Sequence, residues 1–153
     1  MGKKYEDLKS DVKHELQNLE KLMDELKFTT IGHDISSRRI IGSILHDSYN
    51  CCERIFRLIV GEINGAIPVG FEWHRQLLNK VTHEIEGLRP PVISEQMASD
   101  LEEYLEFRHV FRNIYGFELL GDRIIRLKER YSHIFGSFIK EIENFLNKIT
   151  KTK

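Results

Sequence analysis

Cysteine is scarce in this sequence: two of its 153 residues are cysteines, and they are neighbours, Cys51 and Cys52. Side chains at successive positions of a helix point about 100° apart, so this pair is not placed for a normal disulfide. A zinc site would need more ligands, at spacings such as two cysteines separated by two residues. We therefore expect two small, reduced core residues here, and neither a disulfide framework nor a zinc site.

A long apolar run is also missing. No segment approaches the roughly 20 apolar residues that a helix needs to cross a bilayer. Charged helical sequence follows Lys3 and Lys4 directly, where a signal segment would be apolar. We therefore expect a cytoplasmic protein that makes no contact with a membrane.

An excess of basic charge is likewise absent, because 23 lysines and arginines face 24 aspartates and glutamates and give a formal net charge of −1. Proteins that bind nucleic acid over their whole surface usually carry a basic excess, which replaces the counterions of the phosphates. The charge argues against this class. A local basic site remains open, because net charge does not describe how charges are distributed.

Alternation with period two, which marks a half-buried strand, is not found, and apolar residues instead recur every three or four positions. The apolar share of 41% beside 31% charged residues is ordinary for a globular protein. We predict one all-α domain over residues 1–153, an antiparallel helical bundle with short connections around a single core. Its five expected helices cover residues 4–28, 37–63, 73–86, 94–116 and 122–149.

A non-helical joint separates the third and fourth expected helices. Pro90 and Pro91 lack amide donors, and Pro91 pushes Pro90 toward an extended backbone, so the segment Gly87–Val92 cannot continue a helix. Ser94 followed by Glu95 then predicts a helix start, with a capping hydroxyl and an acid in the first turn.

One charge interrupts the apolar stripe of the fourth helix. Arg108 and Tyr115 lie on that stripe and point within about 20° of each other. An unpaired charge on a core-facing stripe is expensive. The spacing alone favours an Arg–Glu pair between helices, with the acidic stretch Asp100–Glu106 as a solvated face that also holds Arg108 or Arg112. The stripe consists of Met97, Leu101, Tyr104, Arg108, Phe111 and Tyr115.

The alternative reading of these positions is an anion site. Arg108, Arg112 and His109 supply hydrogen-bond donors within two turns of the helix. A phenol and an amide, those of Tyr115 and Asn113, lie alongside. This set suits a phosphodiester, because an arginine offers planar, paired donors to phosphate oxygens.

The segment Phe107–Gly116 resembles the signature helix of HepT-like proteins, which belong to the HEPN superfamily. Further similarity lies at Trp73-His74, Leu77-Leu78, Arg89–Ser94 and Phe117–Leu119. Together these segments run roughly from the second expected helix to the start of the last. The resemblance implies a helical homodimer of HEPN-like fold and an endoribonuclease toxin that cleaves RNA without a metal ion or cofactor. It also implies a partner, a small MNT-type nucleotidyltransferase antitoxin that holds the toxin.

The motif of this family is an arginine, four residues, a histidine, one residue and a tyrosine. Arg108 and Tyr115 match it, and the resemblance makes Tyr115 the acceptor of AMP groups attached by the antitoxin. Asn113 stands where the motif has histidine. An amide exchanges no proton near neutral pH, so Asn113 cannot be the usual general acid or base.

Two accounts of this departure are open. In the first, the protein is a catalytically weakened relative that keeps the dimer and the partner contact. In the second, His109, one turn before Asn113 on the same side of the helix, supplies the missing imidazole. The candidate catalytic positions are therefore Arg108, His109, Asn113 and Tyr115.

The resemblance also implies a mechanism. Arg108 would neutralise the scissile phosphate and stabilise the charge of the transition state. A neighbouring acid–base group would activate the ribose 2′-hydroxyl, and the dimer would bring two motif copies to one cleft. Arg112, Trp73 and His74 are the candidate RNA contacts, because a tryptophan can stack on a base. A lone tryptophan at a helix start is more often core packing.

Two other functions compete with this one. The first is a non-catalytic helical dimer that presents a nucleotide or substrate to a nucleotidyltransferase partner. The second is a structural bundle in which Arg108 is merely ion-paired. The dipeptide His46-Asp47 resembles that of metal-dependent phosphohydrolases, but no coherent set of further ligands accompanies it. We expect helix capping or surface pairing for His46 and Asp47.

Overall fold

Five α-helices make up the structure, a computed structural model that describes residues 5–28, 34–63, 66–113 and 121–151. The described residues contain no β-strand, and their one isolated bridge joins Ile85 to Arg89. The predicted all-α bundle is therefore confirmed. None of the helices described is long and apolar enough to pass through a lipid bilayer. The helices are α1 (Glu6–Phe28), α2 (Ile35–Ile63), α3 (Trp73–Lys80), α4 (Glu95–Asn113) and α5 (Gly121–Lys151).

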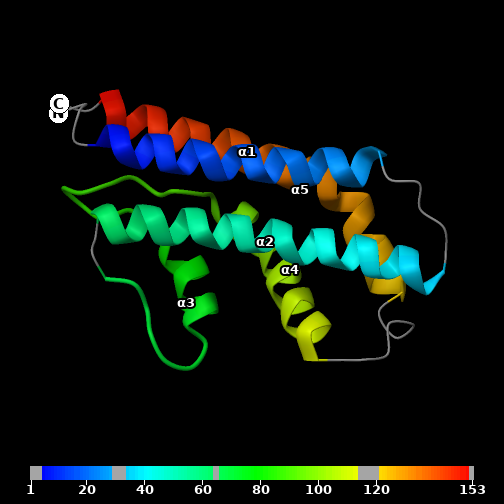
Figure 1. Cartoon of the computed structure of the whole chain (residues 1–153). Helices are drawn as coiled ribbons and strands as arrows, with labels where there is room; N and C mark the ends of the chain where they lie inside the picture. The colour runs from blue at the N-terminus through cyan, green and yellow to red at the C-terminus, as the bar shows by residue number, and fades with distance from the viewer. Residues whose placement is uncertain (1–4, 29–33, 64–65, 114–120, 152–153) are drawn as a thin grey trace.

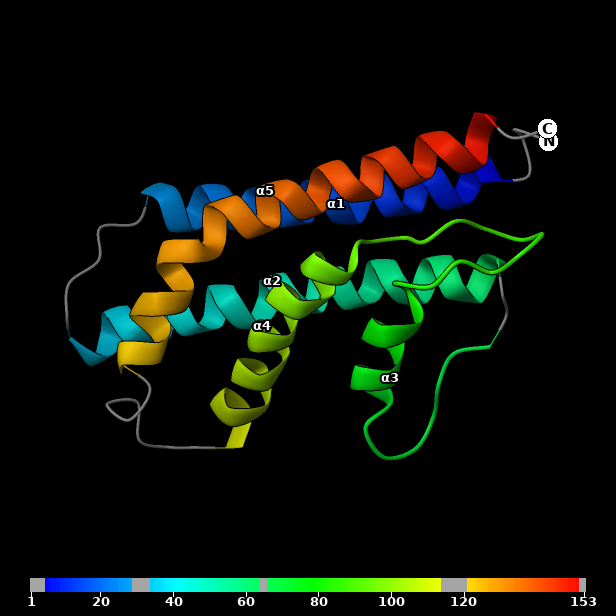
Figure 2. The ribbon, with the colours of Figure 1, turned by 180° about the vertical axis from the view of Figure 1, so that it is seen from behind.

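The central helix is α2 (Figure 1). Helices α1 and α5 run along one side of α2, and the shorter helices α3 and α4 lie along the other, as the view from behind also shows (Figure 2). Helix α1 is antiparallel to both α2 and α5, so its first turn lies beside the last turn of α5. One face of α2 is therefore turned toward α3 and α4 and away from α1.

The core is built on the apolar stripes expected from the sequence. Aromatic rings fill the space among α2, α4 and α5: Phe56 meets Phe138 edge-on at 5.8 Å, and Tyr104 meets Phe135 edge-on at 5.0 Å between ring centroids. Such edge-to-face pairs add to the stabilisation from buried apolar area. The stripe that α1 buries consists of Leu8, Val12, Leu16, Leu19 and Leu26.

Cys51 and Cys52 are free thiols that are buried on α2. Burial raises the pKa of the Cys51 thiol and raises that of Cys52 further above its ordinary range. The neutral thiol is therefore the favoured form of both residues. The expectation of two small core cysteines is confirmed.

Helix α3 ends at Lys80, and the predicted extension to Glu86 is wrong. The carbonyl of Val81 accepts the amides of Val92 at 2.9 Å and Ile93 at 3.3 Å, so it is not the next acceptor of a continuing helix. Its partners lie beyond the proline joint. The apolar spacing after Lys80 indicated a helix because Val81 is a core residue, but tertiary contacts decide its backbone pairing.

The joint after α3 is closed by Arg89, which is 3% exposed. The amide of Ile85 donates to the carbonyl of Arg89 at 2.9 Å, and Gly87 takes the left-handed backbone that this turn requires, with φ at 79°. The guanidinium of Arg89 donates to the carbonyls of His83 (2.8 Å) and Lys80 (3.3 Å). It thereby binds one carbonyl at the end of α3 and one in the turn that follows.

Helix α4 starts as expected. The Ser94 hydroxyl accepts the amide of Met97 at 3.1 Å, the bond of an N-terminal cap. The amide and hydroxyl of Ser94 also donate to the Glu141 carboxylate of α5, at 2.7 and 3.0 Å. The cap thus fixes the start of α4 to α5, and the predicted stripe of α4 is buried from Met97 to Arg108.

Candidate functional site

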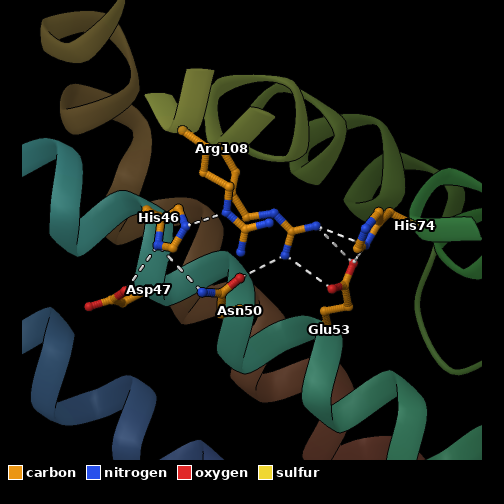
Figure 3. Close-up of polar contacts among 7 residues, drawn as sticks. His46, Asp47, Asn50, Glu53, His74 and Arg108 are labelled. Atoms are coloured by element: carbon orange, nitrogen blue, oxygen red, sulfur yellow. Dashed lines mark hydrogen bonds and ion pairs between the residues drawn. The ribbon is translucent and has the colours of Figure 1, made fainter. Parts of the chain in front are cut away.

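Arg108 is buried between α2 and α4, at 2% exposure (Figure 3). Its Nη1 donates to Oε1 of Glu53 at 3.0 Å and its Nη2 donates to Oε2 of the same carboxylate at 3.1 Å. This is the paired geometry in which a guanidinium and a carboxylate bind most strongly. The Arg–Glu pair favoured by the spacing is present, and its carboxylate comes from α2 and not from the stretch Asp100–Glu106.

Three neighbours complete the surroundings of Arg108. Asn50 accepts from Nη1 at 2.7 Å, and the ring of Tyr49 lies 4.9 Å from the guanidinium carbon in a cation–π contact. The Nδ1 atom of His74 lies 2.8 Å from Glu53 Oε2 and 3.0 Å from Arg108 Nη2. A carboxylate only accepts and a guanidinium only donates. The shorter contact therefore assigns a proton to Nδ1, which His74 donates to Glu53.

Arg112 lies one turn further along α4 and meets His46 of α2. Its Nε donates to Nε2 of His46 at 2.9 Å, and Nδ1 of His46 lies 3.0 Å from Oδ1 of Asp47. The expected surface pairing of His46 with Asp47 is confirmed. Within the described residues, no three His, Cys, Asp or Glu side chains gather as metal ligands would.

Asn113 and His109 lie in the last two turns of α4. The side-chain amide of Asn113 donates to the carbonyl of His109 at 2.7 Å, which is a bond within its own helix. The imidazole of His109 is exposed and makes no hydrogen bond or ion pair with another described residue. Tyr115 lies outside the described residues, so its catalytic role and its modification stay predictions.

A cleft of about 560 Å³ opens beside α3, α4 and the start of α5. Two histidines, His74 and His109, line it. Positive charge in a cleft with low-dielectric walls raises the local concentration of an anion. The arginines exceed the glutamates in the lining, which contains Arg75, Arg108, Arg112, Arg123, Glu72 and Glu106.

Arg112 differs from the other arginines of this cleft. Its side chain is exposed, and its partner is the ring of His46. It is the cleft arginine that has no carboxylate partner in the part of the chain that the structure describes. The other pairs are Arg108 with Glu53, Arg75 with Glu72, Glu102 and Glu106, and Arg123 with Glu106.

The two aromatic residues beside the cleft, Trp73 and Phe71, differ in how much of the ring is exposed to solvent. Trp73 packs against the core, and its ring lies 3.7 Å from the ring of His74 and 5.3 Å from the guanidinium carbon of Arg57. Phe71 lines the cleft and is 91% exposed. It stands between two residues of positive φ, Gly70 at 91° and Glu72 at 61°. The RNA-binding roles of Trp73 and His74 stay predictions.

A family model decides which proteins this chain is related to. The model, described as HepT-like protein, matches residues 40–149. The chain belongs to the HepT-like family. The match includes α3, α4, the proline joint and nearly all of α2. No curated protein and no solved structure matches this HepT-like chain.

Sequence reasoning missed the α2 half of the site in this HepT-like chain. His46, Asn50 and Glu53 follow one another at steps of four and three, so they form one polar stripe on the face that α2 turns toward α4. Arg108 and Arg112 lie four positions apart on α4 and face that stripe. The sequence did contain a signal for this half of the site, because these polar residues recur at the spacing of a buried helix face. Pairing this stripe with α4 required the fold.

Proposed function

We propose that this chain is an endoribonuclease toxin that cleaves RNA without a metal ion, as a homodimer in the cytoplasm, and that an MNT-type nucleotidyltransferase antitoxin holds it. Membership in the HepT-like family supports the class of protein. The arginine-lined cleft beside α4 supports an RNA substrate, because each nucleotide carries one phosphate charge.

One observation carries the RNA reading. Arg112 is exposed in the cleft, and its Nε donates a hydrogen bond to Nε2 of His46, a ring that carries no negative charge. A phosphate that binds Arg112 therefore breaks no ion pair. The two Nη groups of Arg112 remain available for the paired contact with phosphate oxygens that arginine favours.

Arg108 has a different part in this proposal. Both of its Nη atoms already donate to Glu53, so a phosphate in the cleft meets a neutralised pair and not a free charge. The role implied by the resemblance, contact with the scissile phosphate, requires Glu53 to share or release the guanidinium. We assign the first phosphate contact to Arg112 and the charge of the transition state to both arginines.

The bases of the RNA need a contact of their own. Phe71 presents an almost fully exposed ring in the cleft lining, and single-stranded nucleic acids stack their bases on such rings. Trp73 has His74 and Arg57 beside its ring. We therefore assign base stacking to Phe71, in addition to the contacts predicted for Trp73 and His74.

The reaction needs no metal ion because the nucleophile belongs to the substrate. The ribose 2′-oxygen forms a bond to phosphorus while the bond from phosphorus to the 5′-oxygen breaks. The products are a 2′,3′-cyclic phosphate and a 5′-hydroxyl. The 2′-hydroxyl must give up its proton to a base, and Asn113 cannot accept it.

That departure favours a second candidate function, a non-catalytic dimer that presents a nucleotide to the nucleotidyltransferase partner. The observation behind it is the hydrogen bond from the Asn113 side-chain amide to the His109 carbonyl. The side chain at the motif position therefore binds the backbone of its own helix. Arg112 and the cleft would then bind the phosphates of the nucleotide.

Cleavage separates these two functions. The protein is purified without its partner and incubated with single-stranded RNA in EDTA, and its mass in solution is measured by sedimentation. The endoribonuclease reading predicts RNA cleavage by a dimer, and AMP on Tyr115 after co-expression with the nucleotidyltransferase. A dimer that binds the partner and leaves RNA intact establishes the second function. A monomer that binds neither rejects both.

A further inference from the structure

His46 has the surroundings of a residue that transfers protons. It lies on α2, outside the motif of the family, and faces α4 between Asp47 and Arg112 (Figure 3 shows His46 and Asp47). We infer that His46 is the base that takes the proton of the ribose 2′-hydroxyl, the part that Asn113 cannot play. This inference rests on the proposed endoribonuclease function.

The hydrogen bonds of His46 fix its tautomer. The Nε of Arg112 always carries a hydrogen, so Nε2 of His46, at 2.9 Å, must accept with its lone pair. The proton of the neutral ring is then on Nδ1, and Oδ1 of Asp47 accepts it at 3.0 Å. The amide nitrogen of Asn50 lies 3.4 Å from Nδ1, beyond the distance of a good hydrogen bond.

This arrangement matches the geometry of a general base. A carboxylate holds one ring nitrogen protonated, and the other nitrogen presents a lone pair. The ring is held further by Phe111, whose centroid lies 6.0 Å away, and the His46 side chain is 19% exposed. His109, the other candidate imidazole, has no orienting partner among the described residues.

His46 also lies close to the buried pair of Arg108 and Glu53, with Asn50 between them. Asn50 lies beside the His46 ring and accepts from Nη1 of Arg108 at 2.7 Å. The charged groups that face His46 are Asp47 from its own helix and Arg112 from α4. The lone pair of Nε2 therefore accepts a hydrogen bond from Arg112, an arginine that lines the cleft.

The proposed step begins when a phosphate draws the Arg112 guanidinium away from Nε2. The freed lone pair of His46 takes the proton of the 2′-hydroxyl, and the 2′-oxygen bonds to phosphorus. The bond from phosphorus to the 5′-oxygen breaks, and that oxygen takes a proton from water. His46 then returns its proton to the solvent. Asp47 is a positioning residue, because it stabilises the ring after Nε2 is protonated.

The experiment uses the full chain, single-stranded RNA and EDTA. His46→Ala should lower kcat about 100-fold or more, and free imidazole in the buffer should restore cleavage, which a structural role would not allow. The matched control is His133→Ala, an exposed histidine on α5 outside the cleft. Asp47→Asn should lower kcat about 10-fold with KM unchanged, because Asp47 acts through the ring.

The outcomes separate the inference from the proposed function. Wild-type protein that does not cleave RNA overturns both. Wild-type protein that cleaves while His46→Ala cleaves equally overturns the inference alone, and loss of cleavage in His109→Ala would then assign the base to His109. A nitrogen NMR spectrum of the free protein with the His46 proton on Nε2 also overturns the inference, because the expected proton is on Nδ1.

Discussion

Arg108 and Glu53 join α4 to α2 through two parallel hydrogen bonds inside the protein, with side chains that are 3% and 9% exposed. Taking two charges out of water is costly, and the paired geometry offsets that cost. If either partner is removed, the other charge stays buried without its counter-ion. The pair therefore serves the fold as well as any chemistry in the cleft.

Arg108→Ala should lower the free energy of unfolding by about 3–5 kcal/mol, because it leaves the Glu53 carboxylate buried without its cation. Urea unfolding followed by circular dichroism measures this change. The double variant Arg108→Met with Glu53→Leu should recover most of the loss, because it removes both charges and keeps the volume. Wild-type stability in Arg108→Ala would show that the pair is not a buried one.

This pairing affects how cleavage data are read. Loss of RNA cleavage in Arg108→Ala reports on folding as well as on phosphate binding. The double variant separates the two, because it should be folded and still lack the guanidinium. RNA cleavage at the wild-type rate by the folded double variant would remove Arg108 from the mechanism.

Arg112→Ala should weaken RNA binding without lowering stability, because the Arg112 side chain is exposed. Loss of one phosphate contact should reduce the slope of log Kd against log salt concentration by about one unit. Fluorescence anisotropy over a range of salt concentrations measures this slope. Arg54→Ala is the matched control, since Arg54 is 52% exposed and pairs with Glu15 outside the cleft. Equal slopes for the two variants would rule out phosphate binding by Arg112.

Phe71→Ala should weaken binding of single-stranded RNA by about 1–3 kcal/mol, the cost of removing one stacked base from an aromatic ring. The loss should disappear for an RNA that lacks bases at the bound positions. Val69→Ala serves as the control, because Val69 is 84% exposed in the same loop but does not line the cleft. If Phe71→Ala turns the dimer into a monomer and leaves the RNA affinity unchanged, Phe71 is instead a contact between subunits.

Alkaline pH should destabilise the protein through its buried tyrosines. The Tyr104 hydroxyl donates to the carbonyl of Leu127 at 2.7 Å, and the Tyr131 hydroxyl is hydrogen-bonded to Ser48 Oγ at 2.6 Å. Burial raises the pKa of both phenols. Above the ordinary pKa of tyrosine, about 10, the unfolded chain loses phenolic protons that the folded chain keeps. The folded state then binds more protons, so the free energy of unfolding falls as pH rises.

The midpoint of urea unfolding between pH 9 and pH 11 tests this dependence. The buried thiols make the midpoint start to fall above a pH of about 8.5, and the phenols make it fall more steeply above a pH of about 10. The fall should be shallower in Tyr131→Phe, which has one phenol fewer. A midpoint that stays constant through this range would mean that the phenols titrate alike in the folded and unfolded chain.

The local features of the fold were predictable, because they depend on neighbours in the sequence. The Ser94 cap and the buried stripe of α4 follow from spacings of three and four residues. The end of α3 was not predictable in this way. Val81 pairs with amides beyond the proline joint, and no local spacing encodes that choice.

The site was half predictable for the same reason. The sequence indicated that Arg108 needs an anion, but 24 acidic residues competed for it, and Glu53 lies far away in the chain. The resemblance drew attention to α4, where the motif lies. His46 and Asn50 became part of the site only when the fold placed α2 against α4.

The proposed reaction cleaves RNA through the ribose 2′-hydroxyl without a metal ion. Its most direct test compares an RNA with the same strand carrying 2′-deoxyribose at the cleaved positions, in EDTA, with protein purified without its partner. We expect the RNA to be cut to 2′,3′-cyclic phosphate and 5′-hydroxyl ends and the deoxy-substituted strand to stay intact. An uncut RNA, or equal cutting of both strands, would contradict it.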